Sequence, residues 1–366
     1  MADTSVSYKC PNCGAPLTFI PGKKTITCEY CGTEFEAAAI DEMFQAKREL
    51  AARAQEAREA KWDTENAGDE WTDEEAAALK AFTCSSCGAE IVCDENTMAT
   101  ECVYCGNPTM IPKRFDGALK PDLIIPFKKT KQDAVAALKK FYEGRWLLPS
   151  NFTANNRVEA IQPMYVPFWL FDSTVDAQAE FKATIIRIYD TANETVTERR
   201  VYNCQRAGKM QFVKIPADGS KKMNDDFMDS IEPFNYNELV EFNTAYLTGY
   251  LADKYDVSAE ECTERVNKRM ENSAIAVLKS SVDGYDECEV EDYAVVKDIG
   301  KVLYAMVPVW ILTTRYNDKP YTFMMNGQTG KVVGSLPYSF GKSLLYPAVL
   351  TLVLIPIIYF LIMMLS

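Results

Sequence analysis

The longest regular feature of the hydrophobic pattern lies at the end of the chain. From Leu344 to Leu365, 22 successive positions carry no charged side chain. A helix of that length is about 33 Å long, close to the hydrocarbon thickness of a bilayer. A buried core helix is the alternative, but core helices usually keep a polar face. The pattern therefore predicts a transmembrane helix over residues 341–366.

Between residues 113 and 340, segments with helical spacing of apolar residues alternate with segments of strand character. Ser258 and Glu261 have the spacing of a capping box, which starts a helix. Asn326-Gly327 is a strong hairpin-turn pair. These patterns predict an α+β core domain over 113–340. Helices are expected at Lys131–Phe141, Asn237–Tyr255 and Ser258–Lys279, and strands at Met164–Leu170, Phe181–Tyr189, Tyr321–Met325 and Lys331–Gly334.

The core domain contains a faint internal repeat. The run Tyr165–Leu170 reads YVPFWL, and the run Met306–Ile311 reads MVPVWI. Each run leads into a segment that is rich in strand-forming residues, and Trp169 and Trp310 occupy the same place in the two runs. We therefore expect two related β-units that flank a helical insert.

Residues 37–81 are rich in alanine and in charged residues. The pattern predicts one helix that ends near Trp62, a break at residues 66–68, and a second short helix opened by a capping box of Thr72 and Glu75. No stripe of large apolar residues persists at heptad spacing, which argues against a coiled-coil partner helix. The segment is expected to be a semi-rigid helical spacer.

Eight of the twelve cysteines form four C-x-x-C pairs, and a glycine follows each pair. The first two pairs recur 74 positions later without a gap, which indicates a duplicated module. Two C-x-x-C turns supply four thiolates at tetrahedral corners, as a structural zinc site requires. We expect one zinc ribbon over 1–36, a second over 82–112, and two Zn²⁺ ions per chain. The ligands are Cys10, Cys13, Cys28 and Cys31 in ribbon 1, and Cys84, Cys87, Cys102 and Cys105 in ribbon 2.

Two other uses of C-x-x-C pairs stay open, namely a redox-active dithiol and an iron–sulfur cluster. The even spacing and the glycines favour zinc, because glycine allows a left-handed turn around the sulfur atoms. Four thiolates leave no coordination position for water, so both sites are expected to be structural. The four other cysteines have no partner motif and are expected to be structural thiols: Cys93, Cys204, Cys262 and Cys288.

Composition narrows the chemistry further. The chain has no histidine, which removes the commonest general base and the commonest metal ligand. The formal net charge is −13, whereas nucleic-acid binding depends on Lys and Arg that neutralise phosphates. Gly341-Lys342-Ser343 is like the end of a phosphate-binding loop, but Leu336 stands where that motif needs glycine. We expect no catalytic residues, no enzyme activity and no small-molecule substrate.

The cysteine pairs and three downstream runs resemble a known group of proteins. The stretches 10–14 and 28–32 look like the turns of TFIIB-type zinc ribbons. The runs YVPFW at 165–169, GYLADKYD at 249–256 and NGQTGK at 326–331 resemble Gram-positive bacterial zinc-ribbon proteins that end in membrane helices. Such proteins are often labelled as ribbon relatives of a replication-restart helicase. That label does not fit this chain, because its similarity to the helicase is confined to the cysteines.

The resemblance implies a membrane adaptor in envelope stress or membrane organisation, with protein partners of the stomatin-like and phage-shock types. We expect a single C-terminal pass through the cell membrane and a soluble part in the cytoplasm. Eight thiolates need a reducing compartment, which supports this orientation. The two ribbons and the single membrane segment depart from the simple version of the group. A nucleic-acid-binding regulator and an enzyme with an unrecognised core site remain the alternatives.

Overall fold

A computed structural model describes residues 8–18, 24–59, 62–99, 101–113, 115, 119–155, 158–191, 194–223, 225–317 and 319–365. The chain forms two compact units, each assembled from separate segments of the sequence. Unit 1 comprises residues 1–65, 170–215 and 263–302, and unit 2 comprises residues 66–169, 216–262 and 303–366. The segments predicted as ribbon 2 and as the start of the core therefore both belong to unit 2.

The secondary structure is mixed, which confirms the α+β prediction. The helices are α1 (Ala37–Glu59), α2 (Asp73–Ala77), α3 (Lys131–Tyr142), α4 (Ser150–Asn155), α5 (Asp225–Ile231), α6 (Ala259–Ser280) and α7 (Phe340–Leu365), with 3₁₀ turns η1 (Val158–Ala160), η2 (Tyr236–Glu238) and η3 (Thr244–Leu247). The strands are β1 (Tyr8–Lys9), β2 (Pro16–Leu17), β3 (Thr25–Thr27), β4 (Glu34–Glu36), β5 (Leu79–Cys84), β6 (Glu90–Asp94), β7 (Met110–Lys113), β8 (Leu123–Ile124), β9 (Gln162–Asp190), β10 (Thr195–Asp218), β11 (Val240–Glu241), β12 (Leu251–Asp253), β13 (Glu287–Lys297), β14 (Lys301–Tyr316), β15 (Lys319–Asn326) and β16 (Val332–Gly334).

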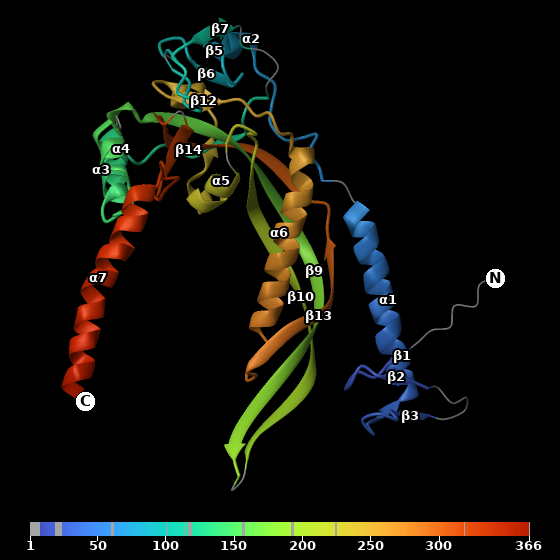
Figure 1. The fold of residues 1–366 in the computed structure, drawn as a ribbon. Helices are drawn as coiled ribbons and strands as arrows, with labels where there is room; N and C mark the ends of the chain where they lie inside the picture. The colour runs from blue at the N-terminus through green and yellow to red at the C-terminus, as the bar shows by residue number, and fades with distance from the viewer. Residues whose placement is uncertain are drawn as a thin grey trace. The chain divides into compact units, whose positions relative to one another are not determined.

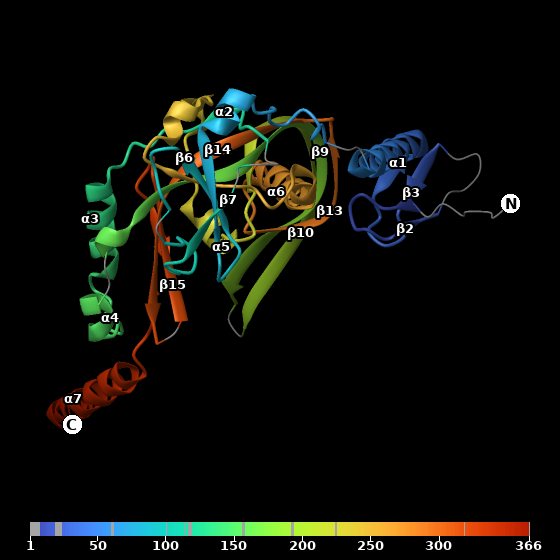
Figure 2. The same ribbon diagram turned by 90° about the horizontal axis from the view of Figure 1, so that it is seen from above.

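Unit 1 is built around a curved antiparallel sheet in which β9 pairs with both β10 and β13. Helix α6 lies against the concave face of this sheet (Figures 1 and 2). The buried side chains of α6 recur every four residues, which places them on one face of the helix. This series comprises Cys262, Val266, Met270, Ala274 and Leu278. Alternate residues of β9 are buried in the same way, and several of them are alanine, which leaves room for the helix.

Unit 2 contains a mixed sheet with the strand order β11-β8-β14-β9-β12-β6-β5-β7, and β15 and β16 continue from β14. The strands of ribbon 2 are part of this sheet, because β6 pairs with β12 through Val92 opposite Ala252. β5 and β7 extend the sheet beyond β6. Ribbon 2 is therefore continuous with the core of unit 2 through backbone hydrogen bonds.

The faint sequence repeat corresponds to two equivalent structural units. In the first, β8 runs parallel to β14 with Leu123 opposite Ala305. In the second, β12 runs parallel to β9 with Leu251 opposite Met164. Ala305 and Met164 are equivalent positions of the repeat, so the two strand pairs have the same register. Each short strand then leads into a helix, α3 in the first unit and α6 in the second.

The tryptophan and the proline of each repeat make matching contacts. The indole nitrogen of Trp310 donates to the carbonyl of Lys129, and that of Trp169 donates to the carbonyl of Val257, both at 2.9 Å. Each accepting carbonyl immediately precedes the N-cap residue of its helix. The proline carbonyls also accept from equivalent glycine amides, Gly327 at 2.8 Å in the first unit and Gly219 at 2.9 Å in the second. The two β-units are therefore related in detail.

One expected helix is wrong. Residues 237–255 form η2, β11, η3 and β12 instead of a continuous helix. The side chains of Asn235 and Asn243 accept from the backbone amides of Asn237 and Ala245, which favours short turns. Gly249 then adopts a φ of +80°, which ends any helical path. The apolar residues that follow pair as β12 between β6 and β9, and this pairing outweighs helical propensity.

The other expected elements are present with adjusted bounds. Thr72, Thr130 and Ser258 cap α2, α3 and α6, respectively, and all three make both hydrogen bonds of a capping box. The two strands expected within residues 164–189 are parts of the single strand β9. The spacer gives way to β5 at Leu79. The hairpin at Asn326-Gly327 is confirmed, since β15 pairs with β16 in antiparallel orientation.

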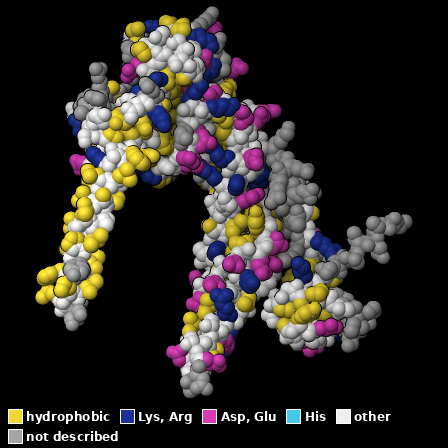
Figure 3. Space-filling model, in the orientation of Figure 1, with side chains coloured by type: hydrophobic (Ala, Val, Ile, Leu, Met, Phe, Trp, Pro, Cys, Tyr) yellow, Lys and Arg dark blue, Asp and Glu magenta, His cyan; other side chains and the backbone are white. Residues whose placement is uncertain are grey.

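Helix α7 has the length and the composition that the sequence predicts. It is long and apolar enough to cross a membrane, and none of its apolar window is buried. Figure 3 shows hydrophobic side chains exposed along its length. The alternative of a buried core helix is therefore wrong for the residues that the structure describes. Pro347 and Pro356 both lie within the helix, which membrane helices tolerate.

Candidate metal centres

Four similar backbone turns hold the eight predicted cysteines. In each turn the amide of the glycine donates to the carbonyl of the first cysteine, at 2.8 to 3.0 Å. The amide of that cysteine donates to the carbonyl of the fifth residue after it, at 2.7 to 2.9 Å. This geometry needs a left-handed residue, which glycine adopts without steric cost. Gly14, Gly32, Gly88 and Gly106 all have φ between 68° and 73°.

The turns bring the sulfur atoms together in two groups of four. Within each group all four sulfur atoms lie within 4.8 Å of one another. The sulfur atoms of Cys10 and Cys31 are 3.7 Å apart, and those of Cys87 and Cys102 are 3.6 Å apart. A tetrahedral ion with metal–sulfur bonds of about 2.3 Å needs a sulfur separation of about 3.8 Å. All eight cysteines are free thiols, so both groups fit a tetrahedral metal ion.

Ribbon 1 is completed by the first turns of α1. Ile40 of that helix is buried in the same small core as Cys10 and Cys28, and Phe44 packs against that core. The hydroxyl of Tyr8 donates to Asp41 at 2.7 Å, and the Tyr8 and Phe44 rings meet edge to face. The first turns of the predicted spacer helix therefore belong to the core of ribbon 1.

Ribbon 2 is held by side chains from other parts of unit 2. Lys222 donates to the carbonyl of Cys87 at 2.7 Å, and Arg315 donates to the carbonyl of Cys105 at 3.2 Å. The hydroxyl of Thr313 donates to the carbonyl of Val103 at 2.6 Å. These contacts fix the backbone that carries the four cysteines. The cluster of ribbon 2 is therefore held more firmly by the surrounding protein than the cluster of ribbon 1.

Each cluster contains one thiol that ionises readily. Hydrogen bonds from Thr33 lower the pKa of Cys31 to about 6. Burial raises the pKa of Cys84, but the backbone amides of Cys87 and Ser86 outweigh it and lower the pKa to about 7. Thiolates are the form that binds metal, so both clusters have an ionised ligand available near neutral pH.

Polar side chains that were not predicted from the sequence link the two turns of each cluster. The Asn12 side chain donates to the Thr33 hydroxyl at 2.9 Å, and that hydroxyl lies 3.2 Å from the sulfur of Cys31. In ribbon 2, Asn107 donates to the Ser85 hydroxyl at 3.2 Å. Their position inside or directly after a C-x-x-C-G turn could have identified them, because such residues face the neighbouring turn.

The four other cysteines lie outside both clusters. Cys93 is fully buried, and its thiol donates to the carbonyl of Thr97 at 3.1 Å. The thiol of Cys262 donates to the carbonyl of Asp218 at 3.6 Å. Cys204 is buried and Cys288 is half-buried. Among the described residues, the two tetracysteine groups are the sets of ligand-type side chains placed to share a metal ion.

Comparison with known proteins yields a relative along almost the whole chain. No protein-family model and no solved structure match the chain. The "Uncharacterized protein YdjG" of Bacillus subtilis (strain 168) is 34% identical over 337 residues, which is 92% of this chain and 92% of the relative. The name of this relative assigns no activity, so a function has to be argued from the geometry of the two clusters and of α7.

Proposed function

This chain belongs to the same family as the Bacillus subtilis protein YdjG, and we propose that it is a membrane-anchored zinc-ribbon adaptor. It binds protein partners at the cytoplasmic face of the cell membrane. Three features support this function: the sulfur geometry of the two clusters, the exposed apolar helix α7, and the different exposure of the two ribbons.

Zinc is the metal that suits both clusters best. Four thiolates in a tetrahedral arrangement are typical of structural zinc and leave no open position for a reacting water. Ribbon 1 buries only a handful of apolar side chains besides its cysteines. A bound Zn²⁺ contributes on the order of 10–16 kcal/mol in such small modules, so the metal would stabilise the ribbon fold.

The segment around the start of α7 suits a membrane surface. The amide of Ser339 donates to the carbonyl of Leu147 at 2.8 Å, and Lys342 donates to the carbonyl of Leu148 at 2.7 Å. These bonds hold Trp146 near Tyr346, with ring centroids 6.5 Å apart. Trp146 is 76% exposed, which is unusual for tryptophan in water but typical at the headgroup level of a bilayer.

Of these three features, the different exposure of equivalent tyrosines is the one that favours an adaptor. Tyr30 of ribbon 1 and Tyr104 of ribbon 2 occupy the same position of the duplicated module. Tyr30 is 77% exposed, whereas the hydroxyl of Tyr104 is buried within unit 2. Ribbon 2 thus uses its tip for contacts inside the protein, and ribbon 1 leaves the same tip available to a partner. Exposed aromatic residues are common anchors of protein interfaces.

Affinity capture of the full-length protein from solubilised membranes tests this function. We expect the wild-type protein to retain membrane proteins, of the stomatin-like or phage-shock type that the resemblance implies, and Tyr30→Ala to lose them while keeping two zinc ions. Tyr189→Ala, which removes a tyrosine 51% exposed on β9, is the matched control and should retain the partners. Recovery of only ribosomes or RNA polymerase would favour a nucleic-acid regulator instead.

A further inference from the structure

The part of unit 2 around the start of α7 is basic, although the whole chain is acidic. Residues 128–150 contain six Lys or Arg and two Asp or Glu, and residues 319–366 contain three Lys and no acidic residue. The formal net charge of the chain is −13. Basic residues beside a membrane helix are attracted by the anionic lipids of the cytoplasmic leaflet. The charge distribution therefore suits a lipid surface on this side of unit 2.

Hydrogen bonds join these two stretches at the start of α7. Lys342 donates to the carbonyl of Leu148 at 2.7 Å and to the hydroxyl of Ser150, the first residue of α4, at 3.2 Å. Figures 1 and 2 show α4 near the start of α7. Residues 143–147, which follow α3, are all exposed and include the apolar pair Trp146-Leu147. This loop therefore lies beside the place where α7 would enter a bilayer.

An open hollow lies beside the loop. It has room for about 520 Å³, within the range of ligand sites, and is lined by the end of α3, the loop and the β15–β16 hairpin. Lys140 and Arg145 line it, and the guanidinium of Arg145 lies over the Phe141 ring, 5.3 Å from its centroid. The side chain of Lys129 runs past Gly330 of the hairpin, with its Cε 3.3 Å from the position of a Cβ atom there. Three cations are therefore grouped around the hollow.

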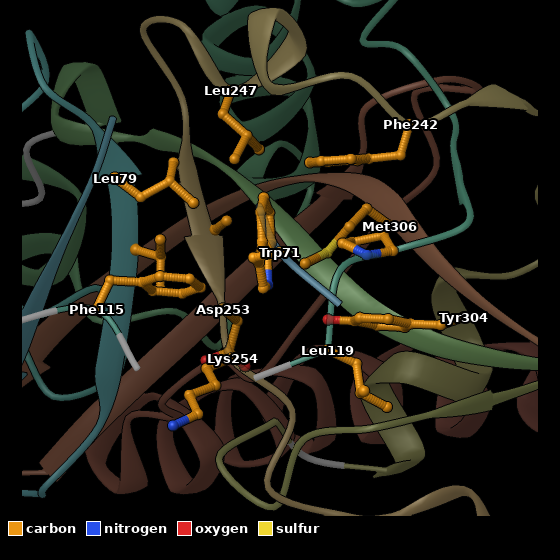
Figure 4. Close-up of a pocket in the computed structure, with 13 residues that line it drawn as sticks. Trp71, Leu79, Phe115, Leu119, Phe242, Leu247, Asp253, Lys254, Tyr304 and Met306 are labelled. Carbon is orange, nitrogen blue, oxygen red and sulfur yellow. The ribbon is translucent and has the colours of Figure 1, made fainter. Parts of the chain in front are cut away.

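The apolar pocket of unit 2 is too small for a ligand of headgroup size. It is lined by Trp71, Phe242 and Met306, among others (Figure 4), and has room for about 20 Å³. That space holds one or two water molecules. A charged headgroup therefore fits the open hollow and not this pocket.

The cations of the hollow are available to a ligand. Lys140 and Arg145 have no carboxylate partner among the described residues, whereas Lys128 pairs with Glu238 at 2.8 Å. Glu143 is the acidic residue among those that line the hollow, and it forms an ion pair with neither cation. Cations grouped without counter-ions create a positive potential that attracts an anion.

A phosphodiester is the anion that suits these side chains. Its two free oxygens match the fork of an arginine guanidinium and also accept from lysine. A soluble phosphodiester offers the same oxygens, but it makes no use of the exposed side chains of Trp146 and Leu147. Tryptophan is typical of the headgroup level of a bilayer. The apolar loop therefore favours a phosphodiester that is carried by a lipid.

From these features we propose that the hollow binds the phosphodiester headgroup of an anionic phospholipid in the membrane that α7 enters. Arg145 and Lys140 donate to the phosphate oxygens, and Lys129 adds to the attraction. Trp146 and Leu147 contact the lipid at the interface. The inference rests on the membrane anchor of the proposed function and needs no protein partner.

Lipid titration of the full-length, zinc-loaded protein in detergent micelles tests the site, with native mass spectrometry to count the bound lipids. The probes are dioleoylphosphatidylglycerol, which is anionic, and dioleoylphosphatidylcholine, which has the same acyl chains and no net charge. We expect the wild type to bind phosphatidylglycerol about ten-fold more tightly. Each Lys or Arg near an anionic headgroup strengthens binding about five-fold, and Glu143 opposes this effect.

Three variants identify the groups responsible. Lys140→Gln/Arg145→Gln exchanges two exposed side chains that make no ion pair, so it should fold, and its preference for phosphatidylglycerol should fall to about two-fold or less. Glu143→Gln removes the opposing carboxylate and should raise the preference about five-fold, which a loss of folding cannot produce. Lys182→Gln/Lys209→Gln is the matched control, because it makes the same charge change at two exposed positions of unit 1 and should keep the wild-type preference.

Glycerophosphoglycerol, the deacylated headgroup, distinguishes a lipid from a soluble ligand. A large excess should leave phosphatidylglycerol bound, and displacement at equal concentration would overturn the proposal. Equal affinity of the wild type for both lipids, or an unchanged preference in Lys140→Gln/Arg145→Gln, would also overturn it while leaving the anchor intact. Wild-type protein in the supernatant after cell fractionation would instead refute the anchor, and this proposal with it.

Discussion

At the residue scale, the two duplications place equivalent side chains in opposite environments. Tyr30 is exposed, whereas the hydroxyl of Tyr104 is buried, although the two tyrosines occupy the same position of the C-x-x-C turn. Asp253 and Ile125 occupy equivalent places in the two β-units, yet one is ionisable and the other apolar. Comparison of the two residues in each pair separates the needs of the fold from other needs. Tyr104 and Ile125 show which side chain the fold accepts at the position, and Tyr30 and Asp253 depart from that environment.

The buried carboxyl group predicts a pH dependence of stability. Burial raises the pKa of Asp253 to about 7, although the hydroxyls of Ser220 and Tyr104 act in the opposite direction. In the unfolded chain the pKa is near 3.9. Between about pH 4 and pH 7 the folded state therefore binds the proton more strongly than the unfolded state. The destabilisation by Asp253 grows as the pH rises through this range and levels off above pH 7.

Asp253→Asn cannot ionise and should lack this effect. We expect the Tm of the variant minus that of the wild type to increase by about 5 °C between pH 4.5 and pH 7.5, measured by scanning calorimetry. A difference that stays constant across this range would mean that Asp253 is not buried as described.

The left-handed conformation of the glycines in the cysteine turns predicts how much an added methyl group destabilises the protein. Gly32 has a φ of +71° and nothing within 4 Å of the position of a Cβ atom, so Gly32→Ala acts through backbone conformation alone. We expect a cost of about 1–2 kcal/mol and faster loss of zinc from ribbon 1 to a chelator. Gly208→Ala is the control, because its Cβ would lie at an ordinary 3.9 Å from Leu278. Equal zinc release in both variants would contradict the turn geometry.

At the scale of elements, backbone pairing decides how the parts of the chain are joined. β5, β6 and β7 form ribbon 2 and also extend the sheet of unit 2. β1 to β4 form two separate two-stranded sheets, and ribbon 1 relies on α1 to close its core. The start of α7 is bonded to the rest of unit 2 through Lys342 and through Ser339, the residue that precedes the helix.

α7 is therefore expected to account for membrane attachment by itself. A chain that stops at Ser339 should move from the membrane pellet to the supernatant after cell fractionation, since no other described helix is long and apolar enough to span a bilayer. Trp146→Ala is the companion variant and should stay in the pellet, because one interfacial side chain contributes little beside a full membrane helix. A truncated protein that still pellets while folded would contradict the role of α7.

At the scale of the whole molecule, the two tetracysteine clusters belong to different units. Ribbon 1 lies in unit 1 and ribbon 2 in unit 2. Metal bound at the first cluster would stabilise a small module with a limited core, whereas metal at the second would fix strands that the larger sheet also uses. Loss of metal should therefore have a local effect in ribbon 1 and a wider effect in unit 2.

Single ligand substitutions separate these effects. Metal analysis of the full-length protein should find two zinc ions, and one in Cys13→Ser or Cys87→Ser. We expect Cys87→Ser to lower the main Tm by several degrees, about 5 °C or more, because β5 to β7 are part of the main sheet. Cys13→Ser should leave the main transition nearly unchanged and expose ribbon 1 to protease. Equal shifts in the two variants would show that the ribbons are coupled.

The sequence by itself determined the features that depend on local spacing. The two tetracysteine groups, two of the three capping boxes, the Asn326-Gly327 hairpin and the length of α7 follow from patterns within a few residues or one uniform segment. Such features need only neighbouring residues, so the backbone forms them in the same way in many surroundings. The repeat of Pro and Trp also indicated two related β-units, because the same contacts are needed twice.

Tertiary structure alone decided everything that depends on distant partners. The segment 237–255 has helical spacing but becomes β12, because β6 and β9 offer strand partners on both sides. The merging of ribbon 2 with the main sheet and the burial of the Tyr104 hydroxyl have the same origin. Each arises where segments far apart in sequence meet, and the free energy of burial and pairing there outweighs local propensity.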